Sequence, residues 1–255
     1  MEQFNRNQGV GVSNRYKVFN TSELVQQFTS RGYSINQIQE QYYRDKALKG
    51  SGKHLIRLRH PDFKVNIDGL IPEIILRNSY NGTSCFEISL GIFRLVCSNG
   101  LMAGTKFSSF KVKHVGKDAI YKVFDSINQV QESSQLLEQA VKRFQGVQLT
   151  PNQISFFAHQ AVELLVPKDA TNIEYLDILK VRRIEDRPND LWTVFNKIQE
   201  NALKGGLKYQ IIDTDIVNGQ IKHIAKNNST RAIKSLDRLV KVNRELWNIA
   251  ERLAV

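Results

Sequence analysis

The acidic residues between positions 185 and 200 are the side chains in this sequence whose types and spacing come nearest to a catalytic site. They are Glu185, Asp186, Asp190 and Glu200. Carboxylate oxygens are ligands for Mg²⁺, so the four acids could hold this ion in a nuclease-like site. Ion pairs with Arg182 and Arg183 explain the same cluster, because mixed-charge clusters are commonly structural networks. We therefore expect a structural network and keep a Mg²⁺-dependent nuclease as an alternative.

Other catalytic signatures are missing from the sequence. The five histidines are scattered, without the close pairing typical of zinc ligands, and no G-x-S-x-G, Rossmann or Walker pattern occurs. The GSGK run at 50–53 lacks both the upstream glycine and the Ser or Thr that a phosphate-binding loop needs. Cys85 and Cys97 lie in apolar runs and are expected as buried free thiols. We expect a protein that is not an enzyme, with no metal and no cofactor.

Positive charge is the dominant feature of the composition. The 255 residues carry a formal charge of +11, which favours polyanionic partners, nucleic acid first and an anionic membrane surface second. Ten Lys and Arg face four Asp and Glu between Gly50 and Lys117. The predicted nucleic-acid contacts on outward strand positions are Arg57, Arg59, Arg77, Lys111 and Lys113. A solvated sheet face, with charge that only keeps the protein soluble, is the alternative.

The strands expected to carry these cations begin where the spacing of hydrophobic residues changes from a helical to an alternating pattern. HLIRLRH at 54–60 alternates as a half-buried strand does, and Asn81-Gly82 between two apolar runs is a strong hairpin signal. Two further strands, GIFRLVCS and FSSFKVKHV, and a long helix from Asp118 to Gly146 complete this part. Upstream, the sequence predicts one helix from Ser22 to Phe28 and another from a Ser34 capping box to about Leu48.

The C-terminal part is predicted to be mostly helical. Thr150 and Pro151 begin one helix, a short hairpin surrounds Asn218-Gly219, and a last helix starts near Thr230. From Lys222 to Arg252, eight bases face three acids, which suggests a second basic surface. The predicted class is α+β, an antiparallel sheet with hairpins packed by one long helix before this helical part. Its expected divisions are 1–49 as a helical arm, 50–147 and 148–255, the last two packing as one domain.

The helix from Asp190 to Asn201 is expected to hold the acidic cluster in place. Asp190 caps it, one side is apolar, and Gly205 and Gly206 end it. Its amides lie at the edge of the apolar stripe, whereas Thr193, Lys197 and Glu200 point further out. The expected network comprises Arg182, Arg183, Glu185, Asp186, Asn196, Gln199 and Glu200.

Several motifs together resemble the phage- and plasmid-borne proteins of the domain-of-unknown-function family 932. They are RRIED at 182–186, DLWTVFNKIQEN at 190–201, Gly205-Gly206, FRLVCSNGLM at 93–102 and the closing helix at 231–254. The resemblance spans about Ile71 to the C-terminus. It implies a mobile-element protein of bacteria or their viruses and no particular reaction.

Two classes of function are compatible with these observations. The first is a nucleic-acid binder that binds or anneals single-stranded DNA in recombination, because the order of strands and long helix is similar to that of ring-forming single-strand annealing proteins. The second is a protein-interaction module that inhibits a host defence system. We expect a cytoplasmic protein that forms no membrane contact, since neither a signal segment nor a membrane-length apolar run occurs. Assembly into a homo-oligomer is a further expectation.

Overall fold

The computed structural model confirms the α+β class. It describes residues 1–62, 70–94, 100–102, 109–116, 118, 119, 121–123, 125, 129, 134–217 and 220–255. The chain divides into two compact units. Unit 1 consists of Met1–Ala140 with Ser235–Val240, and unit 2 of Val141–Lys234 with Lys241–Val255.

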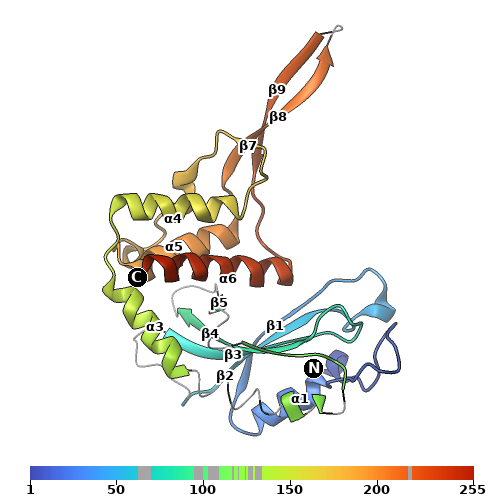
Figure 1. The fold of residues 1–255 in the computed structure, drawn as a ribbon. Coiled ribbons are helices and arrows are strands. Elements are labelled where there is room, and N and C mark those ends of the chain that lie inside the picture. Colours follow the sequence, from blue (N-terminus) through green and yellow to red (C-terminus); the bar gives the residue numbers. More distant parts are fainter. Residues whose placement is uncertain are drawn as a thin grey trace. The chain divides into compact units, whose positions relative to one another are not determined.

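Unit 1 is built on an antiparallel sheet with six described strands (Figure 1). The strands are β1 (Ser34–Glu40), β2 (His54–Arg59), β3 (Leu70–Asn78), β4 (Phe86–Arg94), β5 (Gly100–Met102) and β6 (Ser109–Val112). Their order is β1-β2-β3-β4-β5, and β6 pairs with β4 as well. The predicted hairpin is confirmed, because β3 and β4 pair on either side of the Asn81-Gly82 loop.

One face of this sheet is apolar and carries the main core of unit 1. Ile56, Leu76 and Ile88 oppose one another across β2, β3 and β4 and are almost completely buried. Helix α1 (Thr21–Thr29) lies on this face (Figure 1) and is capped by the Asn20 side chain. Asn78 at the end of β3 donates to the Thr21 hydroxyl at 2.9 Å, which ties the helix to the sheet. Short 3₁₀ turns, η1 (Glu2–Phe4) and η2 (Lys46–Leu48), complete the N-terminal part.

The opposite face of the sheet is mostly polar and has a second, smaller apolar cluster. Leu55 on β2 and Ile75 on β3 pack there with Leu236 and Val240. The last two residues belong to the first turns of α6 (Leu236–Leu253). A segment that is distant in sequence therefore covers part of this face.

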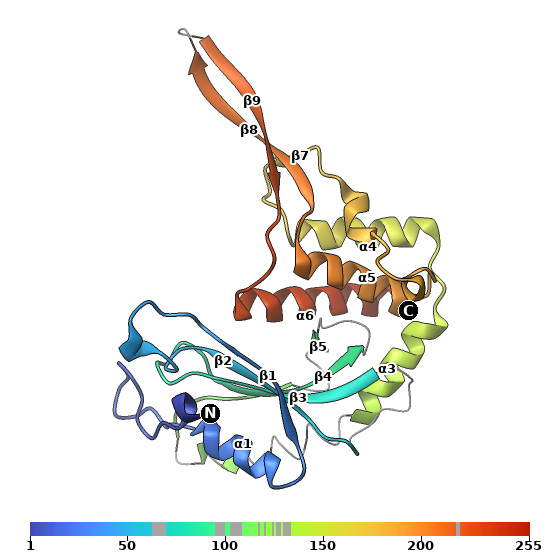
Figure 2. The same cartoon turned by 180° about the vertical axis from the view of Figure 1, so that it is seen from behind.

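Unit 2 is helical and carries a long two-stranded arm, β8 (Lys208–Val217) paired with β9 (Gln220–Ser229) (Figure 2). Its other elements are α4 (Pro151–Glu163), β7 (Ala170–Thr171), η3 (Tyr175–Leu179), η4 (Ile184–Asp186) and α5 (Leu191–Lys204). The end of α3 (Ser134–Gly146) and most of α6 also belong here. Phe195 on α5 contacts Phe157 on α4 and Trp247 on α6, so the three helices share one aromatic core.

Capping residues predicted from the sequence begin and end the unit 2 helices. Thr150 and Gln153 form a capping box at α4, and the Asp190 side chain accepts a hydrogen bond from the Thr193 amide at 2.9 Å. Gly205, with a φ of 73°, ends α5. The predicted hairpin after Gly206 is confirmed, although its Asn218-Gly219 turn lies outside the described residues.

Two predictions about secondary structure are wrong, and part of a third lies outside the described residues. The predicted helix from Ser34 to Leu48 is wrong: Ser34–Glu40 is strand β1, because it pairs with β2, and no Ser34 capping box forms. The runs before and after Gly91 are one strand, β4, and not two, because both pair with β3. The end of the predicted helix from Asp118 to Gly146 is α3 (Ser134–Gly146), whereas residues 120, 124, 126–128 and 130–133 lie outside the described residues.

No helix in the described part of the chain is long and apolar enough to cross a membrane.

Candidate functional site

The polar face of the unit 1 sheet brings together most of the predicted nucleic-acid contacts. We define this face by Arg57, Arg59, Glu73, Arg77, Glu87 and Lys111. The register aligns Arg77 on β3 with Glu87 on β4, and Glu87 with Lys111 on β6. Side chains opposite one another on neighbouring strands are close enough to interact. Charge of both signs is thus concentrated on one side of the sheet.

Glu73 organises one end of the polar face, although its side chain is completely buried. Arg57 donates to its carboxylate at 2.6 Å, and Arg59 donates to it at 2.6 and 3.0 Å. Asn36 adds a hydrogen bond of 2.9 Å to the same carboxylate. Gln37 accepts from the Arg57 guanidinium at 2.6 Å. One buried negative charge therefore orients two guanidinium groups and leaves an excess of positive charge beside them.

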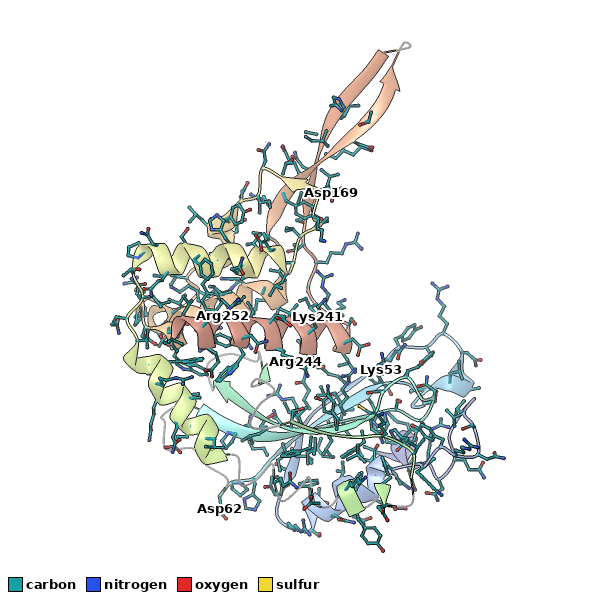
Figure 3. The ribbon with its side chains drawn as sticks, viewed as in Figure 1. Lys53, Asp62, Asp169, Lys241, Arg244 and Arg252 are labelled. Atoms are coloured by element: carbon teal, nitrogen blue, oxygen red, sulfur yellow. The ribbon has the colours of Figure 1, made fainter. Side chains whose placement is uncertain are left out.

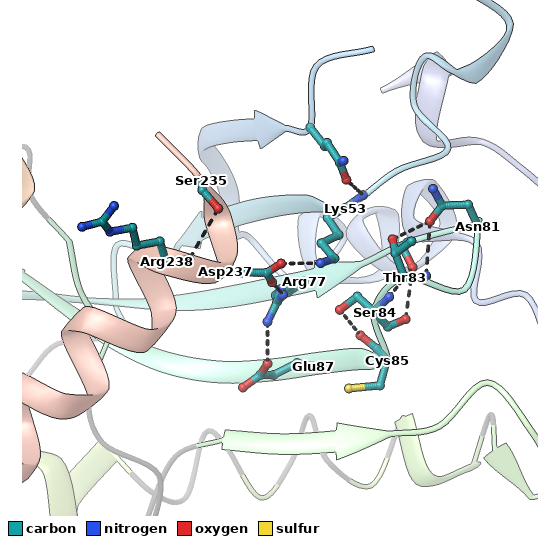
Figure 4. Close-up of polar contacts among 12 residues, drawn as sticks. Lys53, Arg77, Asn81, Thr83, Ser84, Cys85, Glu87, Ser235, Asp237 and Arg238 are labelled. Carbon is teal, nitrogen blue, oxygen red and sulfur yellow. Dashed lines mark hydrogen bonds and ion pairs between the residues drawn. The ribbon is translucent and has the colours of Figure 1, made fainter. Parts of the chain in front are cut away.

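Glu87 organises the other end of the polar face (Figure 4). Its carboxylate accepts a hydrogen bond from the Ser109 hydroxyl at 2.7 Å and lies 3.5 Å from Arg77 and 3.9 Å from Lys111. Arg77 also contacts Asp237, as does Lys53. Burial raises the pKa of Asp237, but the hydrogen bond from Lys53 and the charges of Arg77 and Lys53 outweigh it and hold this pKa below its ordinary value.

The outward orientation expected for these cations is correct for only some of them. Arg59 and Lys111 have side chains that are 35% and 49% exposed, and Lys113 is exposed as well. Arg57 is only 8% exposed and Arg77 is nearly as enclosed, so the expectation is wrong for both. Each is paired with a buried glutamate, a role that the alternation of apolar and basic residues cannot reveal. Phe86 on β4 lies on the other face, where it is fully buried.

The second group of predicted residues lies in unit 2, where Arg183 joins the loop before α5 to the helix. Its guanidinium donates to Glu200 at 2.7 and 2.8 Å and to Asp186 at 3.1 Å. Lys204 donates to the same Glu200 carboxylate at 2.5 Å. Burial raises the pKa of Glu200, but hydrogen bonds and charges from Arg183 and Lys204 outweigh it and lower the pKa.

The other members of the expected network are separated. Glu185 is exposed. Asn196 donates to the Trp192 carbonyl at 2.6 Å within α5, and Gln199 donates to Asn243 on α6 at 2.5 Å. Arg182 donates through Nε to Asn201 at 2.8 Å. Asn201 was not predicted as a site residue. The sequence signal that could have identified it is an amide side chain near the end of an apolar helix.

The prediction that Thr193, Lys197 and Glu200 point outward from α5 is wrong. All three are buried, because the loop from Arg182 to Pro188 and the other helices of unit 2 surround α5 on several sides. Burial lowers the pKa of Lys197, while the charges of Asp186 and Asp190 oppose this change.

The chemistry available to these groups is electrostatic. Among the residues that the structure describes, no three His, Cys, Asp or Glu side chains are placed to hold a metal ion together. The Glu200 carboxylate already accepts hydrogen bonds from two cationic side chains. Cys85, a free cysteine, is half-buried, whereas Cys97 lies outside the described residues.

Comparisons with known proteins identify a family but indicate no activity. The family model "Domain of unknown function (DUF932)" matches residues 10–247, which extends well upstream of the motifs seen in the sequence. Two proteins of Escherichia coli (strain K12), "UPF0380 protein YafZ" and "UPF0380 protein YfjQ", are each 34% identical over 242 residues. Each alignment covers 94% of this chain and 83% of the relative. No solved structure matches the chain.

Proposed function

The chain belongs to the DUF932 family, and from the charge pattern of its first sheet we propose that it binds single-stranded nucleic acid. The observation that carries the proposal is the arrangement of cations on the polar face. Two buried glutamates, Glu73 and Glu87, hold arginine side chains in fixed positions. Arg59, which Glu73 also contacts, is half-buried, and Lys111 and Lys113 are exposed. A polyanionic strand could lie across β2, β3, β4 and β6 and contact Arg59, Lys111 and Lys113.

The proposed binding is electrostatic and independent of base sequence. Phe86 of β4 is buried in the core, and the polar face offers cations that can contact phosphates. Arg57 and Arg77 would act as positioning residues, because they are enclosed and paired. The formal charge of +11 agrees with a polyanionic partner.

A finer proposal concerns biological role, which the family resemblance suggests. A mobile-element protein that binds single strands without sequence preference could bind or anneal complementary strands during recombination. Annealing of two complementary labelled oligonucleotides, followed by energy transfer, would distinguish annealing from simple binding. Sizing of the protein with and without an oligonucleotide would test the proposed homo-oligomer.

Binding to a labelled single-stranded oligonucleotide, followed by fluorescence anisotropy over a range of salt concentrations, tests the main proposal. We expect the triple variant R59A/K111A/K113A to bind more weakly than wild type. The slope of log K against log salt should fall in magnitude by about 2, because each lost phosphate contact on a single strand contributes about 0.7. The matched control is R15A/R31A/K122A, which removes three exposed cations outside the six strands. Equal binding and equal slopes for wild type and the sheet variant would contradict the proposal.

The alternatives make different predictions in the same preparation. A protein-interaction module would bind one host protein in a salt-insensitive pull-down and would not bind oligonucleotides. A nuclease would cleave DNA when Mg²⁺ or Mn²⁺ is added, and that activity would disappear in E185A or E200A. The pairing of Glu200 with Arg183 and Lys204 gives no support to this second alternative.

A further inference from the structure

Unit 2 contains a pocket that the sheet proposal does not use. Its volume is about 250 Å³, and it lies between the segment that precedes η4 and the glycine turn that follows α5. The polar side chains that line it are Asp177, Lys180, Arg182, Asn201 and Lys208. Three cations therefore face one carboxylate around a small cavity.

Asn201 holds one wall of this pocket in place and is only 7% exposed. Its amide nitrogen donates to the carbonyl oxygens of Ile178 and Lys180 at 3.0 and 2.9 Å. Its amide oxygen accepts the hydrogen bond from Arg182 Nε at 2.8 Å. A single side chain thus fixes the segment that carries Lys180 and Arg182, and it orients the Arg182 guanidinium through a contact with Nε.

Part of the lining is the backbone of Gly205 and Gly206. Both have positive φ angles, 73° and 96°, which glycine adopts without a steric penalty. An added Cβ at Gly206 would meet no atom within 4 Å, so open space lies beside this residue. A ligand in the pocket could approach the main chain closely at this position.

The polar groups of the pocket favour an anion that also carries a hydrogen-bond donor. Lys180 and Arg182 are exposed, and Lys208 lies 3.4 Å from Glu174 in a solvent-exposed pair, which is a weak interaction. No ion pair of Asp177 occurs among the described residues. A guanidinium can bind two phosphate oxygens at once, ammonium groups add charge, and a carboxylate accepts from a sugar hydroxyl or an amine.

We propose that this pocket binds a phosphate monoester of the nucleotide type. Lys180, Arg182 and Lys208 contact the phosphate, and Asp177 accepts a hydrogen bond from the sugar or base. The ligand is either a free mononucleotide or the terminal phosphate of a nucleic-acid strand. The inference rests on the pocket alone and does not depend on the proposed role of the sheet.

Calorimetric titration of the 255-residue chain tests the assignment with four kinds of probe. They are inorganic phosphate, adenosine monophosphate, adenosine, and a short oligonucleotide with or without a 5′-phosphate. We expect adenosine monophosphate to bind and adenosine not to bind. If the strand end is the ligand, the 5′-phosphorylated oligonucleotide binds at least tenfold more tightly than its 5′-hydroxyl form; if the free nucleotide is the ligand, the two forms bind equally.

Substitutions of lining residues test whether adenosine monophosphate binds in this pocket. The pair K180A/K208A leaves the Asn201 contacts intact and should weaken binding of adenosine monophosphate by about tenfold or more. The matched control K168A/K234A removes two exposed lysines of unit 2 that do not line the pocket and should bind as wild type does. D177N should weaken binding of adenosine monophosphate and leave binding of phosphate unchanged.

Two results would overturn the assignment. One is the absence of saturable binding by any phosphorylated probe, and the other is equal affinity of wild type and K180A/K208A. The sheet variant R59A/K111A/K113A should bind adenosine monophosphate normally, so the two proposals can fail independently of each other.

Discussion

Two hydrogen bonds, of 2.7 and 2.8 Å, join the Arg183 guanidinium to the Glu200 carboxylate, which is almost completely buried. The two residues are 17 positions apart, one in the loop before α5 and the other in its third turn. Bidentate contacts of this kind combine strength with a defined orientation. The pair therefore fixes the charged loop against the helix that forms the centre of unit 2.

Removal of this carboxylate should destabilise the protein strongly. We expect E200A to lower the free energy of unfolding by about 3 kcal/mol, because a partly enclosed guanidinium and Lys204 lose their partner. Urea denaturation followed by circular dichroism measures the change. E185A is the control, since Glu185 is exposed in the same loop and its loss should change the free energy little. Similar effects of the two variants would show that the Arg183–Glu200 pair contributes nothing specific.

The two glycines after α5 should differ sharply in their tolerance of a side chain. A Cβ at Gly205 would lie 2.6 Å from the Arg231 carbonyl carbon and 2.8 Å from the Ala232 nitrogen. G205A should therefore lower the free energy of unfolding by about 3 kcal/mol or more, from backbone overlap added to the positive φ. G206A has the positive φ without the overlap and should lower it by only about 1 kcal/mol. Thermal and urea unfolding of both variants would check this order, and equal effects would contradict it.

Acidification should destabilise the fold through His54. This histidine is fully buried on the apolar side of the sheet, where its ring contacts the Thr21 hydroxyl at 2.8 Å. Burial lowers the pKa of His54 from 6.5 to about 4, against the opposing effect of the Gly52 carbonyl. Between these values the unfolded chain binds a proton at His54 that the folded protein does not bind. The contribution of neutral His54 to the free energy of unfolding is therefore fully present above pH 6.5 and decreases as the pH falls toward 4.

The decrease attributable to His54 is of the order of 3 kcal/mol across that interval. Burial also lowers the pKa of His114, which adds a change of the same sign. Urea denaturation at a series of pH values measures the slope. H54Q should have a shallower slope than wild type, whereas H223Q, at an exposed position, should keep the wild-type slope. An unchanged slope in H54Q would show that His54 does not control the transition.

Glu73 should be essential to the polar face although no solvent reaches it. We expect E73Q to lower the free energy of unfolding by about 3 kcal/mol, because the buried Arg57 and its neighbour Arg59 lose their shared negative charge. E40Q makes the same chemical change at an exposed position of β1 and is the matched control. Chemical denaturation of both variants decides the matter, and a small effect of E73Q would mean that the cluster relaxes without this carboxylate.

Asp237 should stabilise unit 1 more than an exposed acid does. It contacts both Arg77 and Lys53, and it lies in the first turn of α6, where negative charge is favourable. D237A should lower the free energy of unfolding by about 1 kcal/mol at low salt and less at high salt, because the side chain is half exposed. D213A removes the exposed pair with Lys226 and should have no measurable effect. Unfolding in low and high salt compares the two.

The second basic surface predicted near the C-terminus remains a prediction. Lys241, Arg244 and Arg252 lie along α6 (Figure 3). K241A/R252A removes two of these cations at exposed positions. If this surface also contacts nucleic acid, the variant should lower the salt dependence of oligonucleotide binding by about 1.4 in slope. An unchanged slope would confine binding to other parts of the molecule.

The sequence alone determined the features that depend on neighbouring residues. Asp190 and Thr150 mark helix starts because their side chains satisfy amides only three positions away. Gly205 marks a helix end because its φ of 73° disfavours any other residue. The β3–β4 hairpin follows from a glycine turn between two apolar runs. Local geometry and chemistry are sufficient in each of these cases.

Only the tertiary structure decided which polar residues are buried and with which partners. Ser34–Glu40 is a strand because β2 supplies an edge for it, and helical spacing of its residues could not reveal that edge. Arg57 alternates with apolar residues as an exposed cation would, yet Glu73, 16 positions away, holds it inside. Asp237 reaches Arg77 across 160 positions. These contacts join distant segments, and burial depends on what packs against a face, so sequence spacing within one element cannot specify them.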